Sequence, residues 1–151
     1  MKFCVREMGV SDAPSWARMR LTLWPEDSAA AHQEAIAELL PRDDAFGLIA
    51  ESASGEAAGF CEIEIRRYAN SCLLRPVPFL EGIWVAPQFR RKGVGAQLIH
   101  HAEARLLARG FREFGSDARM DNPSSHKAHA AWGSYETERV VYFRKPIGPK
   151  E

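Results

Sequence analysis

A short basic turn contains the residue types that bind an anion. Three basic residues, 90–92, lead directly into Gly93-Val94-Gly95, and a helical pattern follows. The first N–H groups of a helix have no partner within it, and the helix dipole places partial positive charge there. Glycine lets a ligand approach the backbone closely, and arginine and lysine add charge-assisted hydrogen bonds. The segment therefore predicts a phosphate or pyrophosphate site. A glycine-rich turn with solvated basic residues is the alternative.

Two carboxylates lie in or at the end of predicted strands, where a charged side chain is unusual unless it has a partner or a function. Glu81 interrupts a nearly uniformly apolar stretch, 79–86, and an unpaired carboxylate in a buried strand is costly. Asp117 ends the next predicted strand, at the carboxyl edge where open α/β sheets bind ligands. If the two strands are neighbours, both carboxylates flank one site. The alternatives are a paired structural carboxylate at Glu81 and a capping or turn residue at Asp117.

Alternating strands and helices must hold these residues. Period-two and apolar runs indicate strands, whereas capping residues such as Ser11-Asp12 and Ser28 start helical patterns. The strands are predicted over 3–8, 46–52, 58–68, 79–86, 111–118 and 137–146, and the helices over 13–24, 29–40, 94–109 and 123–132. Without repeats or a linker, the pattern predicts one mixed α/β domain over residues 1–151.

Composition excludes several classes of protein. The 151 residues are 46% hydrophobic and 26% charged with zero net charge, so no overall field favours nucleic acid or a membrane surface. Six basic residues and one acid lie between residues 88 and 112, which concentrates positive charge around the turn. The chain shows neither an 18-residue apolar run nor a signal-peptide pattern, and we expect a cytoplasmic protein. Neither the three cysteines nor the adjacent His100 and His101 have metal-ligand spacing, so no metal site is expected.

Two common phosphate motifs do not fit the turn. The pattern G-x-x-x-x-G-K-[ST] is absent, and the third glycine of a dinucleotide fingerprint is missing after Gly95. The strand, "RRKGVG" and the following helix instead resemble the acetyl-coenzyme A signature [Q/R]-x-x-G-x-[G/A] of the GCN5-related N-acetyltransferase (GNAT) superfamily. This resemblance implies the GNAT fold: an α/β domain with one mixed, mostly antiparallel sheet, a splayed parallel central strand pair, and flanking helices.

Further blocks narrow the resemblance. "LTLWP", "FLEGIWVAPQFRRKGVGAQLI", "SDA" followed by "DN", and "ETERVVYFRK" together resemble the bacterial aminoglycoside 6'-N-acetyltransferases, and they cover most of the chain. In that family the donor is acetyl-CoA and the acceptor is a polycationic aminosugar antibiotic. The "FLEG" to "GVGAQLI" block is the most specific of these pieces.

The resemblance also implies which residues hold the cofactor. The turn binds the pyrophosphate, and the preceding strand pairs with the pantetheine arm. His129 stands where many acetyltransferases place a tyrosine that protonates the departing thiolate, and Asn122 matches a cofactor-contacting position. A polar surface histidine and a helix cap are the alternatives for these two residues. The implied cofactor residues are Ile83, Trp84, Val85, Arg90, Arg91, Lys92, Gly93, Val94, Gly95, Ala96, Asn122 and His129.

Acetylation of an amine requires that the amine lose a proton, because alkylamines resemble lysine with a pKa of about 10. The resemblance implies that Glu81 relays this proton, that Asp117 anchors the substrate, and that the Val85 N–H stabilises the oxyanion. The predicted substrate residues, from the resemblance and from their side-chain chemistry, are Trp24, Tyr68, Glu81, Asp117 and Glu136.

The substrate residues have ordinary alternatives. Trp24 offers a flat face to a sugar or a cation, but it is equally explained as a core residue, and Tyr68 as a loop or dimer contact. Acids near both ends of the chain, including Glu136, suit the negative rim that a polycation needs, or are solvated charges. The other acids considered are Glu26, Asp27 and Glu138.

Three functions remain open at this point. They are an aminoglycoside 6'-N-acetyltransferase, an acetyltransferase for another small amine, polyamine or protein amine, and a non-catalytic acyl-CoA-binding domain. Glu81 and Asp117 at paired strand ends favour catalysis, and the "LWP" and "FLEG" blocks favour the aminoglycoside. The predicted last strand contains "VVYFR", which suits pairing across a homodimer interface.

Overall fold

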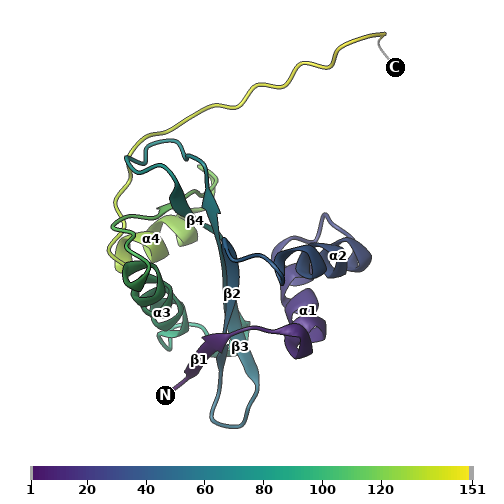
Figure 1. Ribbon diagram of the computed structural model, residues 1–151, viewed down its shortest axis with the longest axis vertical. Helices are drawn as coiled ribbons and strands as arrows, with labels where there is room; N and C mark the ends of the chain where they lie inside the picture. Colours follow the sequence, from purple (N-terminus) through teal and green to yellow (C-terminus); the bar gives the residue numbers. More distant parts are fainter. Residues whose placement is uncertain (1, 150–151) are drawn as a thin grey trace.

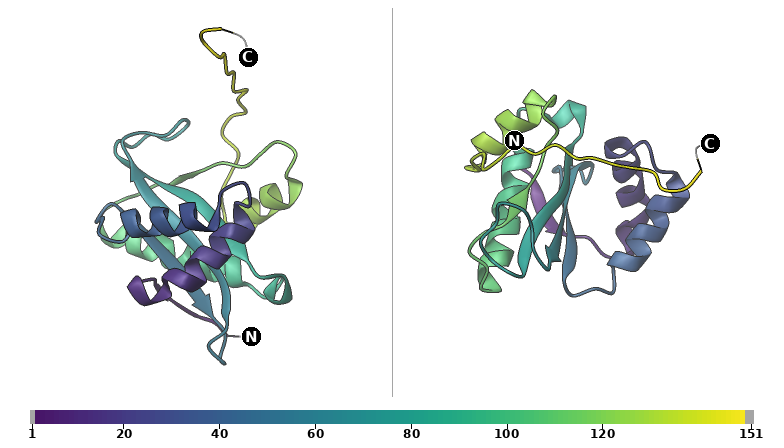
Figure 2. Two further views of the ribbon diagram at one scale, coloured as in Figure 1. Left: turned by 90° about the vertical axis from the view of Figure 1, so that its right-hand side faces the viewer. Right: turned by 90° about the horizontal axis from the view of Figure 1, so that it is seen from above.

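The computed structural model describes residues 2–149 and contains a five-stranded sheet with helices on both faces (Figures 1 and 2). The strand order is β1-β2-β3-β4-β5; β1 to β4 are antiparallel and β4 runs parallel to β5. This confirms the predicted fold class. The elements are β1 (Cys4–Glu7), η1 (Val10–Asp12), α1 (Ala13–Leu23), α2 (Ala29–Leu39), β2 (Ala45–Glu51), β3 (Ala57–Arg66), β4 (Val77–Val85), η2 (Pro87–Phe89), α3 (Val94–Ala108), β5 (Gly115–Ser116) and α4 (Pro123–Ala131).

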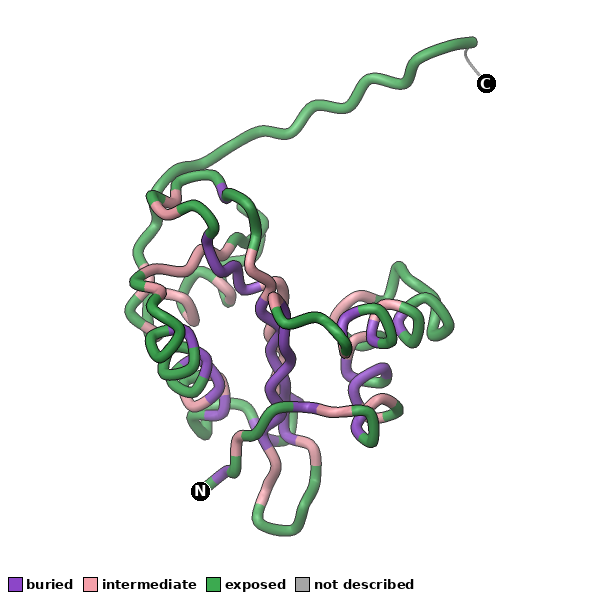
Figure 3. The backbone as a smooth tube through the Cα atoms, in the orientation of Figure 1, coloured by how far each residue is buried: buried purple, intermediate pink, exposed green. Residues whose placement is uncertain are grey.

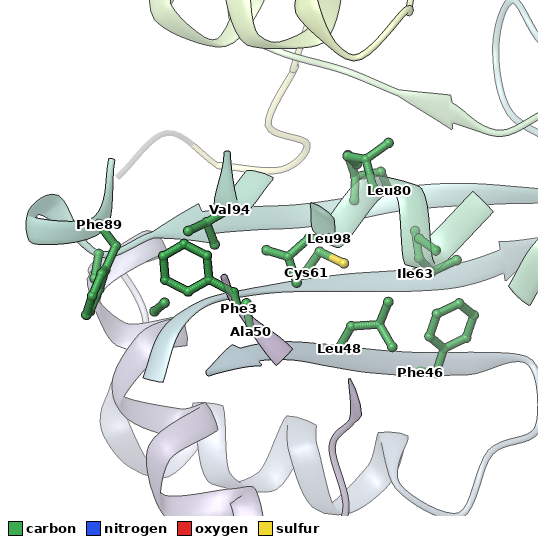
Figure 4. Close-up of a cluster of buried hydrophobic side chains, with 14 of the residues drawn as sticks. Phe3, Phe46, Leu48, Ala50, Cys61, Ile63, Leu80, Phe89, Val94 and Leu98 are labelled. Carbon is green, nitrogen blue, oxygen red and sulfur yellow. The ribbon is translucent and has the colours of Figure 1, made fainter. Parts of the chain in front are cut away.

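Strand alternation produces two hydrophobic cores. On one face, side chains such as Cys61 and Ile63 of β3 pack against Leu98 of α3 (Figure 4). On the other face, Phe60 of β3 packs with Trp16 of α1 and residues of α2. Figure 2 shows the resulting three layers, with α3 and α4 on one side of the sheet and α1 and α2 on the other. The sheet is therefore covered on both faces, as its apolar strands require.

A β-bulge explains the carboxylate in β4. Glu62 of β3 faces Gly82, but the next pair is Ile63 with Leu80, so Glu81 is an extra residue without a partner in this register. A bulge redirects side chains and is frequent beside active sites. Here it lets Leu80 pack in the core with α3 while Glu81 lines the cleft on the α1 and α2 side.

The parallel strands β4 and β5 pair over only two positions. Phe79 faces Gly115 and Leu80 faces Ser116. The strand predicted over 111–118 is therefore reduced to two residues, and the remaining part of β4, from Glu81 to Val85, has no β5 partner. The splayed pair that the resemblance implied is present, and it exposes a stretch of β4 backbone on this side.

The strand predicted over 137–146 is wrong for this structure. Residues 135–149 are exposed and form no strand, and Figures 1 and 3 show them as an extended segment leaving the domain. Alternating β-forming residues such as Val141 and Phe143 favour an extended backbone, but a strand also needs a neighbouring strand to pair with. We call residues 135–149 the C-terminal arm.

The two predicted helix caps have different outcomes. Ser28 caps α2, since its side chain accepts a hydrogen bond from the Ala31 N–H. Asp12 occupies the N-cap position of α1 but makes no capping bond. Its carboxylate instead accepts hydrogen bonds from both terminal nitrogens of Arg6 and from the Gly9 N–H, each at 2.8 Å. Arg6 is a stronger partner for the Asp12 carboxylate than the backbone N–H groups at the start of α1, because its hydrogen bonds are charge-assisted.

Candidate active site

The basic turn has the backbone geometry that an anion site needs. Gly93 is the N-cap of α3 with φ of 84°, a left-handed conformation that glycine adopts without steric cost. Arg91 also has positive φ, at 61°. The turn leads into the first N–H groups of α3, at Val94, Gly95 and Ala96, which have no partner within the helix. These donors and the helix dipole make the start of α3 suitable for a phosphate group.

The second glycine of the turn is required for a different reason. A Cβ on Gly95 would lie 2.9 Å from the Trp132 ring, which follows α4, so this glycine lets α4 pack closely against the start of α3. Arg90 is partly engaged elsewhere, since its Nε donates to the Val85 carbonyl oxygen at 3.0 Å. Arg91 and Lys92 are exposed. The turn thus combines a fixed backbone with accessible positive side chains.

An acidic cleft of about 440 Å³ lies between the α1 and α2 helices and strands β3 and β4. Trp24, at the end of α1, and Glu81, in the bulge of β4, both line it. Six carboxylates and two guanidinium groups line the cleft, so its charge favours a cation. These residues are Glu26, Asp27, Glu38, Glu62, Glu64, Glu81, Arg20 and Arg42.

Glu81 is held by an arginine. Arg66, the last residue of β3, donates to both carboxylate oxygens at 2.8 and 2.7 Å, and its guanidinium stacks 3.7 Å from the centre of the Phe79 ring. The hydrogen bonds to Glu81 raise the pKa of Arg66 above its ordinary value, and the charge of Asp117 adds to this shift. Leu80 faces Ser116 in the sheet, so Glu81 and Asp117 each follow the last position at which β4 and β5 pair. Asp117 is exposed and does not line the cleft.

Glu62 lies at the buried end of the cleft. Its side chain is 4% exposed and accepts hydrogen bonds from Arg20 at 2.6 Å and from the Trp16 indole at 2.7 Å. Burial raises the pKa of the Glu62 carboxyl, and the charge of Arg20 opposes that shift. The cleft therefore ends on an ion pair that is already satisfied, whereas its outer acids face solvent.

His129 of α4 contacts the end of β5. Its Nε2 lies 2.7 Å from the Ser116 hydroxyl, and its Nδ1 lies 2.7 Å from the Ser125 carbonyl oxygen. Since Nδ1 donates to that carbonyl, Nε2 accepts from Ser116. The histidine is thus oriented toward the point where β4 and β5 separate. Asn122 caps α4 through the Ser125 N–H, which is the alternative considered for it.

The remaining predicted substrate residues lie farther out. Tyr68 is 62% exposed, in the loop after β3, with Arg75 above its ring at 5.8 Å. Glu136 is in the C-terminal arm and is paired with Arg139, which lowers the pKa of Glu136. Neither residue lines the cleft, in contrast to Trp24 and Glu81.

Comparison with known proteins identifies the family. The model of the acetyltransferase (GNAT) family matches residues 14–133. The chain belongs to this family. It is also 44% identical over 146 residues to an aminoglycoside N(6')-acetyltransferase type 1 of Klebsiella aerogenes, with 95% of this chain and 96% of that protein covered.

Solved GNAT structures show the same likeness. The aminoglycoside antibiotic 6'-N-acetyltransferase AAC(6')-Ih from Acinetobacter baumannii superposes with a TM-score of 0.90 at 36% identity, covering 97% of this chain and 100% of that one. A structure of AAC(6')-Iy in complex with the bisubstrate analog CoA-S-monomethyl-acetylneamine gives a TM-score of 0.91 at 38% identity, with the same coverage. GNAT enzymes use acetyl-CoA, and this chain shares that co-substrate.

Sequence reasoning missed several residues of this GNAT site. Arg66 and Ser116 have no recognisable signal in the sequence, because their partners are 15 and 13 residues away along the chain. Glu62 and Glu64 lie two residues apart in β3, but this spacing does not reveal that α1 and α2 cover that face. Within residues 2–149, no three or more His, Cys, Asp or Glu side chains gather as metal ligands, and no helix there is long and apolar enough to cross a membrane.

Proposed function

We propose that this protein transfers the acetyl group of acetyl-CoA to the 6'-amino group of aminoglycosides and so confers resistance to them. The acidic cleft that leads to Glu81, beside the splayed end of β4, carries the proposal. Polyammonium substrates match that charge, and the similar proteins named above act on this class of antibiotic. The single domain, residues 1–151, would contain the complete site.

The same geometry supports the proposed cofactor residues. The start of α3 receives the pyrophosphate through the N–H groups of residues 93–96, with Arg91 and Lys92 as exposed partners. The pantetheine arm lies along β4 at residues 83–85, where β5 has separated. Asn122 and His129 lie at the α4 side of this path.

The reaction is direct attack of the amine on the thioester carbonyl. Glu81 takes the ammonium proton, the new C–N bond forms, and the C–S bond breaks. The Val85 N–H stabilises the oxyanion, a role worth about 3 kcal/mol in the transition state. Asp117 anchors another ammonium group. The thiolate leaves unaided, because Nδ1 of His129 donates to the Ser125 carbonyl and Nε2 accepts from the Ser116 hydroxyl. Trp24 forms the apolar wall of the cleft, and Tyr68 and Glu136 contact the outer part of the substrate.

Thiol release tests the substrate class. We expect acetyl-CoA to be consumed with kanamycin, but not with a 6'-hydroxy analogue, spermidine or a peptide amine. Glu81→Gln should lower kcat by about 100-fold, because a general base contributes on that scale. Full activity on spermidine with none on kanamycin would instead indicate another amine, and CoA binding without any turnover would indicate a non-catalytic domain.

We further propose that two chains form a homodimer through the C-terminal arm. Its side chains Val141, Tyr142 and Phe143 are 76%, 80% and 92% exposed. Such apolar surface and unpaired extended backbone favour association with another chain. The sheet ends at β5, a two-residue edge strand, so the arm of a second copy can extend it by antiparallel addition.

Light scattering tests the dimer. The intact protein should show twice the mass of one chain, and truncation after residue 134 should leave a monomer. Leu73→Lys is the matched control, because Leu73 is 91% exposed but lies outside the arm, and it should remain dimeric. A monomeric mass for the intact chain would contradict the proposal.

The free cysteines support a cytoplasmic location. Cys4, Cys61 and Cys72 form no disulfide in the part of the chain that the structure describes, as is usual in reducing compartments. Fractionation of cells that produce the protein should recover it with cytoplasmic rather than periplasmic markers.

A further inference from the structure

A network of hydrogen-bonded, buried polar side chains lies beneath Trp24, and the proposed reaction does not use it. His32 and Glu62 are only 1% and 3% exposed, although buried polar groups are costly unless hydrogen-bonded. Arg20 connects them: Nη1 donates to both Glu62 oxygens at 2.6 Å, and Nε donates to Nδ1 of His32 at 3.2 Å. Trp16 donates the remaining hydrogen bond to Glu62. The hydrogen-bond network therefore connects β3, through α1, to α2.

This series of hydrogen bonds ends at Trp24. Because Nδ1 of His32 accepts a hydrogen bond from Arg20, the ring proton lies on Nε2, which donates to the Trp24 carbonyl oxygen at 3.0 Å. That carbonyl is at the end of α1, where helix carbonyls lack partners within the helix. The His32 and Trp24 rings also lie side by side, with centroids 6.4 Å apart and planes at 23°, and the Arg20 guanidinium is 4.8 Å from the indole centroid.

The sheet holds the indole from the other direction. A Cβ on Gly82 would lie 2.5 Å from the Trp24 ring, so the ring rests directly on the backbone of β4, one residue from Glu81. Phe60 meets the indole edge-on at 6.5 Å. Trp24 is thus held between the helices and the sheet while part of it lines the cleft.

We propose that His32, supported by Arg20 and Glu62, is a positioning residue that fixes Trp24 as the wall of the amine cleft and thereby sets the affinity for the aminoglycoside. The proposal rests on the proposed function, in which Trp24 contacts the substrate. A side chain whose place is already fixed loses little freedom when the substrate binds, so its contact contributes more to affinity.

Substitutions at His32 separate positioning from folding. His32→Leu removes both hydrogen bonds and should raise KM for kanamycin about tenfold, the size of a lost aromatic contact. The kcat value and the KM for acetyl-CoA should stay within about twofold. A Gln amide can reach the Nε2 position and bond the Trp24 carbonyl, so His32→Gln should restore KM. An Asn amide reaches only the Nδ1 position, so His32→Asn should not restore it.

A control variant accounts for lost stability. Ile36 lies one turn beyond His32 in α2 and is 1% exposed in the same core. Ile36→Ala should lower the unfolding midpoint in urea at least as much as His32→Leu, yet leave KM for kanamycin unchanged. An equal rise of KM in both variants would overturn the positioning role.

Fluorine NMR gives a readout besides activity. The four tryptophans can be labelled as 5-fluorotryptophan, and Trp24→Phe assigns the Trp24 signal. His32→Leu should shift or broaden this signal and leave those of Trp84 and Trp132 in place. An unchanged signal and KM in His32→Leu would overturn this proposal alone. An unchanged KM in Trp24→Ala would overturn both it and the substrate contact of Trp24 in the proposed function.

Discussion

At the scale of single residues, the central feature is a carboxylate whose partner is close in space but distant in the chain. Glu81 is both the proposed proton acceptor and the bidentate partner of Arg66. The guanidinium is itself fixed by stacking on Phe79. Arg66 thus determines where the carboxylate points. In the proposed reaction, a polycationic substrate meets a Glu81 that is already oriented.

Substitution of Arg66 should therefore affect catalysis. Arg66→Met should lower kcat about tenfold, because a misplaced catalytic group costs rate on this scale. Arg66→Lys should recover little, since lysine cannot reproduce a bidentate pair. Steady-state kinetics with both substrates is the measurement, and KM for acetyl-CoA should not change. Arg105→Met is the control, because Arg105 pairs with Glu7 at the surface; equal losses in both variants would contradict the orienting role.

At the scale of elements, the turn before α3 uses its two glycines differently. Gly93 needs a positive φ but has open space around its α-carbon, whereas Gly95 is crowded by Trp132. The first requirement belongs to the backbone of the turn, and the second belongs to the packing of α4 on α3. The same G-x-G pattern thus satisfies two independent constraints.

Alanine substitutions should separate these constraints. Gly93→Ala should reduce the free energy of unfolding by about 1–2 kcal/mol through backbone strain alone, and Gly95→Ala by about 1–3 kcal/mol through overpacking. In a Trp132→Leu background, the Gly95→Ala cost should shrink while the Gly93→Ala cost stays the same. Urea unfolding of the single and double variants measures this, and identical coupling at both glycines would show the interpretation to be wrong.

At the scale of the whole molecule, a chain of zero net charge separates its charges into two sites. Positive groups surround the start of α3, and carboxylates line the cleft between α1, α2 and the sheet. The β4 strand joins the two regions. In the proposed mechanism, an anionic donor and a cationic acceptor therefore approach the same strand from different directions. On that proposal, electrostatic attraction guides each substrate to its own site.

Salt should weaken the capture of the amine. Raising NaCl from about 0.05 to about 0.5 M should lower kcat/KM for kanamycin about tenfold through screening, with little change in kcat. Glu38→Gln, which removes one acid of the cleft, should make this dependence shallower. Rates at fixed pH across the salt series measure it, and an unchanged kcat/KM would argue against an electrostatic role for the cleft.

The sequence by itself determined those features that depend on neighbours along the chain. The anion turn at residues 90–95, the cap at Ser28 and the order of most strands and helices are local, because hydrogen bonding and side-chain periodicity act over a few residues. Together with the resemblance to a known family, they were sufficient for the fold class and for predicting a site around Glu81. They left Trp24 open between a core position and a place at the substrate site.

Only the tertiary structure decided the features that depend on distant partners. The bulge that redirects Glu81, the Arg66 pair and the burial of His32 and Glu62 arise when segments 12 to 46 residues apart meet. The exposed C-terminal arm shows the converse, since its residues favour a strand but pair with no strand in the part of the chain that the structure describes. The local sequence determines which secondary structures a segment favours. Long-range packing decides which of those structures the segment adopts.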